Sequence, residues 1–275
     1  MRFGLALGGG GLKGVAHLGV LKVLVDHGLP PDLVVGTSAG AIAAALYGSG
    51  LLPSELSSQW SFPVFFTSST RKIGGLPLGM LDGRMIENMF KRLWGKKRFS
   101  DLKKPAAVVA CDLYSGHTII YSALPPVRPL PRDIAMGGDV PVWQAVRASI
   151  SIPALFSPFP LGPHLLVDGG VTANVPADVA RVLGATKVIA VELSTAVTPS
   201  SLHNAGEVLM RSLDIMSRRL TALTLTLSAD FVLSPLKDVY PPPGFWEVGR
   251  LKELVQAGAE ATVRALPEIR KILEL

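Results

Sequence analysis

Short apolar runs alternate with amphipathic segments along most of the chain. The apolar runs are rich in β-branched residues and are typical of buried strands, which we expect at residues 2–7, 33–35, 106–111, 117–121, 165–167 and 187–193. The amphipathic segments carry apolar residues at helical spacing, and we expect helices at residues 15–27, 41–47, 84–94, 142–150, 174–183 and 203–227. This alternation predicts an α/β fold.

Three further segments break the alternation. Residues 52–81 are irregular and residues 125–141 are proline-rich, so we expect loops there. Residues 251–275 have a helical pattern that we expect to be interrupted at Gly258 and Pro267. With 275 residues, 48% of them hydrophobic, the chain has enough apolar material for one large domain or two small ones.

Ser38 lies at the junction between the second predicted strand and the helix that follows it. Residues 36–40 read Gly-Thr-Ser-Ala-Gly, which matches the Gly-x-Ser-x-Gly pattern of a nucleophile elbow. Gly36 and Gly40 suit so tight a turn because a Cβ atom at either position would crowd it. The pattern favours a serine nucleophile, and an ordinary turn of small residues is the alternative interpretation.

Residues 8–14, Gly-Gly-Gly-Gly-Leu-Lys-Gly, connect the first strand to its helix. Their Gly-x-Gly-x-x-Gly pattern, at Gly9, Gly11 and Gly14, is also the fingerprint of a dinucleotide-binding loop. That kind of site needs an acidic residue at the end of the second strand, where this sequence has Ser38 and its neighbours. We therefore disfavour a nicotinamide cofactor. The loop fits better as a source of backbone N–H donors for an oxyanion beside a serine nucleophile.

Asp168 follows an apolar strand and precedes Gly169 and Gly170, where we expect the backbone to turn sharply. An Asp-Gly turn that binds its own backbone is one interpretation, and a base for Ser38 is the other, because a serine hydroxyl needs a neighbouring base. The order Ser38, Asp168, His203 is that of an α/β-hydrolase triad. We disfavour this triad because His203 opens a helix and follows no strand that would aim its side chain.

Positive charge is concentrated in one segment. Residues 82–104 contain eight Lys or Arg and three Asp or Glu, which gives +5 of the formal net charge of +6. Because the rest of the chain is nearly neutral, we do not expect a nucleic-acid surface. Residues 84–104 are either the solvated end of an ordinary packed helix or a peripheral contact with an anionic membrane.

Cysteine usage and the first residues limit the remaining possibilities. The single cysteine, Cys111, excludes a disulfide framework and a cysteine-rich zinc site, and we expect it in the core. Residues 1–8 are too short and too rich in glycine for a secretory signal, so we expect a cytoplasmic protein, possibly in contact with the inner face of the membrane. Two long uncharged stretches, residues 33–54 and 148–167, contain turn residues or prolines and are expected in the core rather than across a membrane.

Three motifs in order resemble those of the patatin-like phospholipases, in particular the compact bacterial members. They are the glycine loop at residues 8–14, Gly-Thr-Ser-Ala-Gly at residues 36–40, and Asp-Gly-Gly at residues 168–170. The similarity extends from about residue 3 to about residue 193, and more loosely through the C-terminal helices at about 203–275. The resemblance implies one patatin-like acyl hydrolase domain over residues 1–275. It also implies an α/β fold in the form of a three-layer α/β/α sandwich with a mainly parallel central sheet.

The resemblance also implies roles for particular residues. Ser38 would be the acylated nucleophile and Asp168 the general base, in a Ser–Asp dyad without histidine. The oxyanion hole would be formed by the backbone N–H groups of Gly9, Gly10 and Gly11. The motif-supporting residues would be Lys13, Gly14, Gly36, Gly40, Gly169 and Gly170.

The implied activity is hydrolysis of carboxylic esters of lipids, as a lipase, lysophospholipase or esterase, with no cofactor and no metal. The alternative is a non-catalytic module that binds acyl chains on the same fold. A pure binding module has no need of the serine, the carboxylate and the glycine loop together, so we favour the enzyme.

Overall fold

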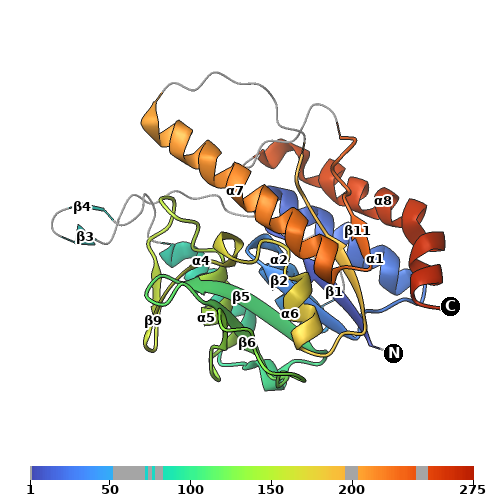
Figure 1. The fold of residues 1–275 in the computed structure, drawn as a ribbon, viewed down its shortest axis with the longest axis horizontal. Helices are drawn as coiled ribbons and strands as arrows, with labels where there is room; N and C mark the ends of the chain where they lie inside the picture. Colours follow the sequence, from blue (N-terminus) through green and yellow to red (C-terminus); the bar gives the residue numbers. More distant parts are fainter. Residues whose placement is uncertain (1, 52–71, 74–75, 78–82, 196–203, 240–246) are drawn as a thin grey trace.

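A mainly parallel β-sheet forms the centre of the fold (Figure 1). The structure is a computed structural model that describes residues 2–51, 72–73, 76–77, 83–195, 204–239 and 247–275. The strands are β1 (Phe3–Leu7), β2 (Leu33–Thr37), β5 (Ala106–Asp112), β6 (Thr118–Ser122), β7 (Ile134–Met136), β8 (Phe159–Leu161), β9 (His164–Asp168), β10 (Lys187–Val191) and β11 (Phe231–Leu233). A separate pair, β3 (Lys72–Ile73) and β4 (Leu76–Pro77), is antiparallel.

The strand order of the sheet is β11-β10-β1-β2-β5-β6-β7. Every pair from β11 to β5 is parallel, β6 is antiparallel to β5, and β7 is parallel to β6. The hairpin of β8 and β9 joins the sheet because β9 pairs antiparallel with the end of β5. Since β1, β2 and β5 run in the same direction, their carboxyl ends lie at one edge of the sheet, where α/β proteins place their functional loops.

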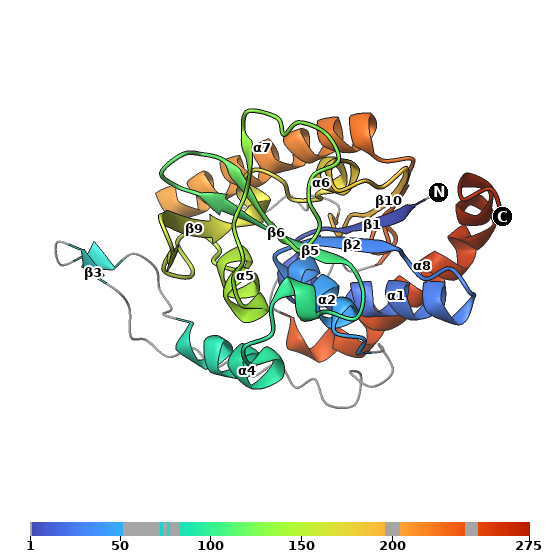
Figure 2. The ribbon, with the colours of Figure 1, turned by 90° about the horizontal axis from the view of Figure 1, so that it is seen from below.

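Helices cover both faces of the sheet (Figure 2). The helices α1, α2, α4, α5 and α8 pack in one layer, and α6 and α7 pack in the other. Their bounds are α1 (Ala16–Asp26), α2 (Ala39–Gly48), α4 (Arg84–Trp94), α5 (Val142–Ser149), α6 (Ala177–Val182), α7 (Ala205–Ser228) and α8 (Leu251–Ile272), with short 3₁₀ turns η1 (Gly11–Val15), η2 (Phe99–Asp101), η3 (Gly169–Val171) and η4 (Val248–Arg250). This arrangement confirms the predicted three-layer α/β/α fold.

Successive side chains of β1 are buried on opposite faces of the sheet, so helices must pack on both faces. Leu5 and Leu7 belong to the apolar cluster beneath α1 and α8, whereas Ala6 belongs to the cluster beneath α6. All three are fully buried. A strand that is buried on both faces reads as a continuous apolar run, as the sequence pattern indicated.

Several short elements fall where the sequence predicted loops or no strand. The proline-rich segment 125–141 contains β7, and the sheet also gains β8 and β11. Each has three residues, which is too short for alternation to be visible in the sequence. Of the segment expected to be irregular at 52–81, only residues 72–73 and 76–77 are among the described residues, and they form a small hairpin.

The predicted interruption of the last helix is wrong. Helix α8 continues from Leu251 to Ile272 with Pro267 inside it, and Gly258 lies against α1. A Cβ atom on Gly258 would come within 2.1 Å of the Ala16 carbonyl oxygen, so the glycine serves close helix packing rather than a break. Burial of Leu254 and Ile269 holds the helix in place despite the backbone hydrogen bond that is lost because Pro267 has no N–H donor.

The helices of the described segments are either too short or too polar to span a lipid bilayer.

Candidate functional site

Ser38 lies at the turn between β2 and α2, at the carboxyl edge of the sheet. Its backbone has φ 55° and ψ −120°, a conformation that side-chain-bearing residues rarely adopt. The residue is 5% exposed. A sharp strand-to-helix turn of this kind is the geometry of a nucleophile elbow, because it holds the side chain at the tip of the turn.

Gly36 and Gly40 allow this turn by close approach. A Cβ atom on Gly36 would lie 2.0 Å from the Gly40 carbonyl oxygen, and one on Gly40 would lie 2.1 Å from the Leu7 carbonyl oxygen. Gly14, in the glycine loop after β1, also allows close packing, since a Cβ atom on it would lie 2.2 Å from Cβ of Ala39. These contacts pack the start of α2 against both β1 and the glycine loop.

The strand register brings Asp168 to the level of Ser38. Strand β6 pairs with residues 107–111 along one edge of β5, so β2 and β9 share the other edge, where Thr37 pairs with Val109 and Asp168 pairs with Ala110. Ser38, the residue after Thr37, therefore lies next to the end of β9 on the same edge of β5. The Ser38 side chain is near enough to the Asp168 carboxyl group to lower its pKa through hydrogen bonding, so two residues far apart in the sequence meet at the sheet edge.

Asp168 is 6% exposed. Desolvation by burial raises its pKa to about 6, and the hydrogen bonds from the Ser38 side chain and the Gly170 amide act in the opposite direction. The Gly170 amide donates to Oδ1 across 2.7 Å. A carboxylate with a raised pKa accepts a proton more readily near neutral pH than an ordinary aspartate does.

Gly169 and Gly170 fit the tight turn behind Asp168. A Cβ on Gly169 would lie 2.4 Å from the Val109 carbonyl oxygen, and a Cβ on Gly170 would lie 3.0 Å from Oδ1 of Asp168. The first glycine therefore lets the turn pack against β5, and the second lets its own amide reach the carboxylate.

The glycine loop runs beside Ser38, but its amides are not equivalent. A Cβ on Gly9 would lie 3.3 Å from Cβ of Ser38, which places this residue next to the serine. However, the Gly9 amide donates to the Asn174 carbonyl oxygen across 3.0 Å. The expectation that Gly9 supplies an oxyanion donor thus conflicts with this bond. Within the described ranges, the amides of Gly10 and Gly11 have no acceptor.

Two residues that the sequence analysis did not single out support the serine and the glycine loop. Oγ of Ser149, at the end of α5, accepts a hydrogen bond from the Ser38 amide at 2.9 Å and donates to the Val109 carbonyl oxygen at 2.6 Å. Asn174 accepts from Gly9, as described above. Ser149 is fully buried, and its local sequence carries no signal of this role because the bond reaches a residue far away in the chain.

Ser151 connects the same helix end to Asp168. The Asp168 amide donates to the Ser151 carbonyl oxygen at 2.9 Å, and Oγ of Ser151 accepts from Nη1 of Arg147 at 2.7 Å. Arg147 is 1% exposed and forms an ion pair with Glu87 of α4 at 3.3 Å. The end of α5 therefore holds the backbone of both Ser38 and Asp168.

Three of the described histidines have side-chain partners away from Ser38. Nε2 of His17 donates to the Gly8 carbonyl oxygen at 2.8 Å, and Nδ1 of His27 bonds to the Val23 carbonyl oxygen. His164 pairs with Asp112 at 3.1 Å. His203, the histidine of the disfavoured triad, lies outside the described residues.

Lys13 is half-buried and lies close enough to α7 for the charges of that helix to affect it. Burial is the main reason that its pKa is lowered, and the charge of Arg218 adds to this effect while Asp214 and Glu192 oppose it. The residue therefore lies where the glycine loop meets the opposite helical layer.

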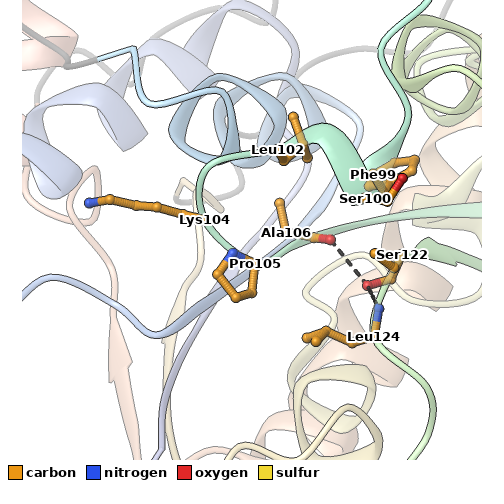
Figure 3. Close-up of a pocket in the computed structure, with 9 residues that line it drawn as sticks. Phe99, Ser100, Leu102, Lys104, Pro105, Ala106, Ser122 and Leu124 are labelled. Carbon is orange, nitrogen blue, oxygen red and sulfur yellow. Dashed lines mark hydrogen bonds between the residues drawn. The ribbon is translucent and has the colours of Figure 1, made fainter.

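A hollow of about 150 Å³ lies at the other end of β5 and belongs to a different part of the molecule. Figure 3 shows its wall, where Oγ of Ser122 donates to the Ala106 carbonyl oxygen and accepts from the Leu124 amide, both at 3.1 Å. Ala106 begins β5, whereas Asp168 lies beside Ala110 near its end. Among the described residues, no three His, Cys, Asp or Glu side chains form a cluster suited to a metal ion.

Comparisons with known proteins point to one family. Residues 5–181 match the family model described as patatin-like phospholipase. Patatin-like phospholipase domain-containing protein 7 of Rattus norvegicus is 31% identical over 213 residues, which cover 74% of this chain and 14% of that protein. Patatin-like phospholipase domain-containing protein 6 of Homo sapiens is 32% identical over 199 residues, which cover 70% of this chain and 13% of that protein.

A bacterial relative and a solved structure extend the likeness. An uncharacterized NTE family protein of Mycobacterium tuberculosis is 29% identical over 274 residues, which cover 98% of this chain and 41% of that protein. This chain thus spans only part of the relatives it matches. The crystal structure of VipD from Legionella pneumophila has a TM-score of 0.53 and 13% identity, covering 97% of this chain and 66% of that one, and it supports the fold alone.

Proposed function

From the premise that this chain belongs to the patatin-like phospholipase family, we propose that it is a serine acyl hydrolase that cleaves carboxylic esters of lipids. The observation that carries this proposal is the position of the Ser38 side chain next to Asp168, a buried carboxyl group whose pKa is raised to about 6. A serine nucleophile needs a nearby base, and the Asp168 carboxylate lies next to the Ser38 side chain.

The first half of the reaction forms an acyl-enzyme. Oγ of Ser38 attacks the ester carbonyl carbon while its proton passes to the Asp168 carboxylate. The carbonyl oxygen becomes an oxyanion, for which the amides of Gly10 and Gly11 are the proposed donors. The tetrahedral intermediate then collapses, the bond to the alcohol oxygen breaks, and Asp168 returns the proton to the departing alcohol.

The second half releases the acid. A water molecule attacks the acyl-Ser38 carbonyl carbon and gives its proton to Asp168, which later protonates Oγ of Ser38. The product is a carboxylic acid and the enzyme is restored. The turn conformation of Ser38 and the hydrogen bond from its amide to Oγ of Ser149 support this proposal, because they fix the position of the serine before substrate arrives.

The test uses a fluorophosphonate probe, which reacts with activated serines. Intact protein is expected to take up one label at Ser38, found by mass spectrometry, and Ser38→Ala is expected to take up none. We expect Asp168→Asn to lower turnover of lipid esters by at least about a hundredfold because the base is lost. Labelling at another serine, or full turnover by Asp168→Asn, would refute the proposed dyad.

The sequence-based membrane hypothesis for residues 84–104 forms a second part of the proposal. Phe90 and Trp94 of α4 are buried in the core, whereas Lys96 and Lys97 are exposed beyond its end. The segment therefore combines an anchored helix with a basic surface. Contact of this surface with anionic lipid would keep a lipid hydrolase near its substrate, with each basic residue contributing about 1 kcal/mol.

A further inference from the structure

The side chain of Asn174 lies in the proposed active site, next to the glycine loop. A Cβ atom on Gly9 would lie 2.7 Å from Oδ1 of Asn174 and 3.3 Å from Cβ of Ser38. A Cβ atom on Gly170 would lie 3.2 Å from the same Asn174 oxygen and 3.0 Å from Oδ1 of Asp168. The carboxamide therefore lies between the glycine loop and the turn after β9, close to both side chains of the proposed dyad.

The backbone at Asn174 is fixed to the elements around the proposed nucleophile. Its carbonyl oxygen accepts the Gly9 amide at 3.0 Å, and the carbonyl oxygen of Ala173 accepts from Oγ1 of Thr37 at 2.7 Å. Thr37 is fully buried at the end of β2, directly before the elbow serine. The Ala173 amide donates to the Gly169 carbonyl oxygen at 2.8 Å. Because three elements of the site hold this backbone, the side chain is positioned before substrate binds.

The Asn174 carboxamide has hydrogen-bonding groups available for a ligand. An asparagine side chain offers one acceptor oxygen and two N–H donors. Among the residues that the structure describes, none forms a hydrogen bond with this carboxamide, and the residue is half-buried. A side chain that served only to hold the loop would be hydrogen-bonded to it. Here the backbone of Asn174 holds the loop, which leaves the side chain for substrate.

The neighbouring groups indicate what the carboxamide would bind. The carbonyl group of an ester attacked by Ser38 must lie beside the serine, and its oxygen becomes negative during attack. The Gly9 amide is already bound to the Asn174 carbonyl oxygen, so one expected donor is missing. Asparagine side chains serve as oxyanion donors in enzymes of acyl transfer. A half-turn about the Cβ–Cγ bond of Asn174 exchanges its oxygen and nitrogen, so Nδ2 can take the position next to Gly9.

We propose that Asn174 is a further catalytic residue, whose Nδ2 donates a hydrogen bond to the oxyanion formed on the substrate ester. It acts there together with the amides of Gly10 and Gly11. This inference rests on the proposed function and adds one donor to it. The hydrogen bond is stronger once the oxygen carries negative charge, so it stabilises the transition state more than the bound substrate.

The test compares variants of the full chain on a soluble ester. Asn174→Leu keeps a side chain of similar size but has no N–H donor. We expect kcat to fall about a hundredfold or more with KM nearly unchanged, which is the usual effect of losing one oxyanion donor. Asn174→Ala removes the same donor and should show the same loss. The matched control is Asn88→Leu, at an exposed position of α4, which should have the kcat of the parent.

A trifluoromethyl ketone distinguishes an oxyanion donor from a residue that only supports the loop. Such a ketone forms a tetrahedral adduct with an active-site serine, and the adduct carries a negative oxygen as the transition state does. Its inhibition constant should rise in the Asn174 variants by about the same factor by which kcat/KM falls. Circular dichroism and thermal melting check folding, and Asn174→Ala carries the test if Asn174→Leu does not fold.

Two results would overturn this inference. The first is a normal kcat in both Asn174 variants. The second is a loss of kcat without weaker inhibition by the ketone, which would make Asn174 a support for the loop. Neither result depends on whether fluorophosphonate labels Ser38 in the parent protein. Absence of that label would instead refute the proposed function, so the two failures are distinguishable.

Discussion

The backbone amide of Ser38 donates a hydrogen bond to Oγ of Ser149, across 2.9 Å. Oγ of Ser149 in turn donates a hydrogen bond to the Val109 carbonyl oxygen of β5. The serine at the elbow is therefore fixed to two strands and to the end of α5, although its backbone conformation is strained.

Replacing Ser149 with alanine should lower kcat without a comparable change in KM. The substitution leaves the Ser38 amide and the Val109 carbonyl group buried without their partner, which typically costs about 1–3 kcal/mol. We expect a loss of about tenfold or more in kcat and slower fluorophosphonate labelling.

The matched control for this prediction is Ser122→Ala. Ser122 also accepts from an amide and donates to a carbonyl group, but at the other end of β5. Its loss should lower the melting temperature with little effect on kcat. If both variants lose activity equally, the effect of Ser149 is general destabilisation rather than positioning.

The pH dependence of activity should follow Asp168. The group must be deprotonated to accept a proton, and its pKa is raised to about 6 mainly by burial. We therefore expect kcat/KM for a soluble ester to rise with pH through about 6 and to level off above it.

Asp112→Asn provides the comparison for this pH profile. Burial alone would raise the pKa of Asp112, but hydrogen bonds from His164, Ser115 and two amides lower it to about 2, so it stays charged throughout the range. Its replacement should leave the midpoint unchanged. A profile whose midpoint moves in Asp112→Asn, or one that is flat between pH 5 and 7 in the parent, would contradict the assignment to Asp168.

Stability at mildly acidic pH should depend on His17. Burial lowers its pKa to about 4, against 6.5 for the free side chain, while the bond to the Gly8 carbonyl oxygen acts in the other direction. Nδ1 is buried without a partner, so protonation would place a charge in the core. Between these two pKa values the unfolded chain binds a proton that the folded chain does not.

The contribution of His17 to folding is therefore present above pH 6.5 and is lost as the pH falls toward about 4. Urea denaturation at several pH values should show that His17→Gln reduces the loss of stability over this range. Asp168 acts in the opposite sense, since its raised pKa favours the folded state at low pH. His27→Gln, which alters a partly exposed histidine, should retain the pH dependence of the parent protein.

The basic surface beyond α4 should contribute to binding of anionic vesicles. Replacing Lys96 and Lys97 with glutamine removes two charges from an exposed segment. At about 1 kcal/mol for each charge, binding should weaken by about tenfold or more. The double variant Lys237→Gln and Lys252→Gln makes the same change in net charge elsewhere, and it should bind nearly normally. Binding that does not depend on the fraction of anionic lipid would eliminate this surface as a membrane contact.

Much of the site could be predicted from the sequence because its main parts are local motifs. The turn at Ser38 and the turn at Gly169–Gly170 each depend on glycines that are adjacent in the sequence. The role of Ser149 could not be predicted in this way, because it depends on a hydrogen bond to a residue 111 positions away. The same applies to Gly9, whose amide is bound by Asn174.

The fold was predictable to a similar extent. Buried strands such as β1 and β5 have enough apolar residues to be recognised, and their helices follow at the expected positions. Strand β7 has only three residues, and its place is fixed by pairing with β6 rather than by its own sequence. Pro267 is tolerated within α8 because tertiary packing compensates for a local preference.

The left-handed backbone at Ser38 favours the reactivity of the serine at the expense of the stability of the fold. Holding a side chain at φ 55° typically costs about 1–3 kcal/mol, which the surrounding fold must offset. A chain selected only for heat resistance would relax this turn, whereas one selected for rapid acylation would retain it. Engineering for higher thermal stability should therefore begin in the packing of α1 against α8, far from Ser38. Substitutions there can stabilise the fold without changing the conformation of the reactive turn.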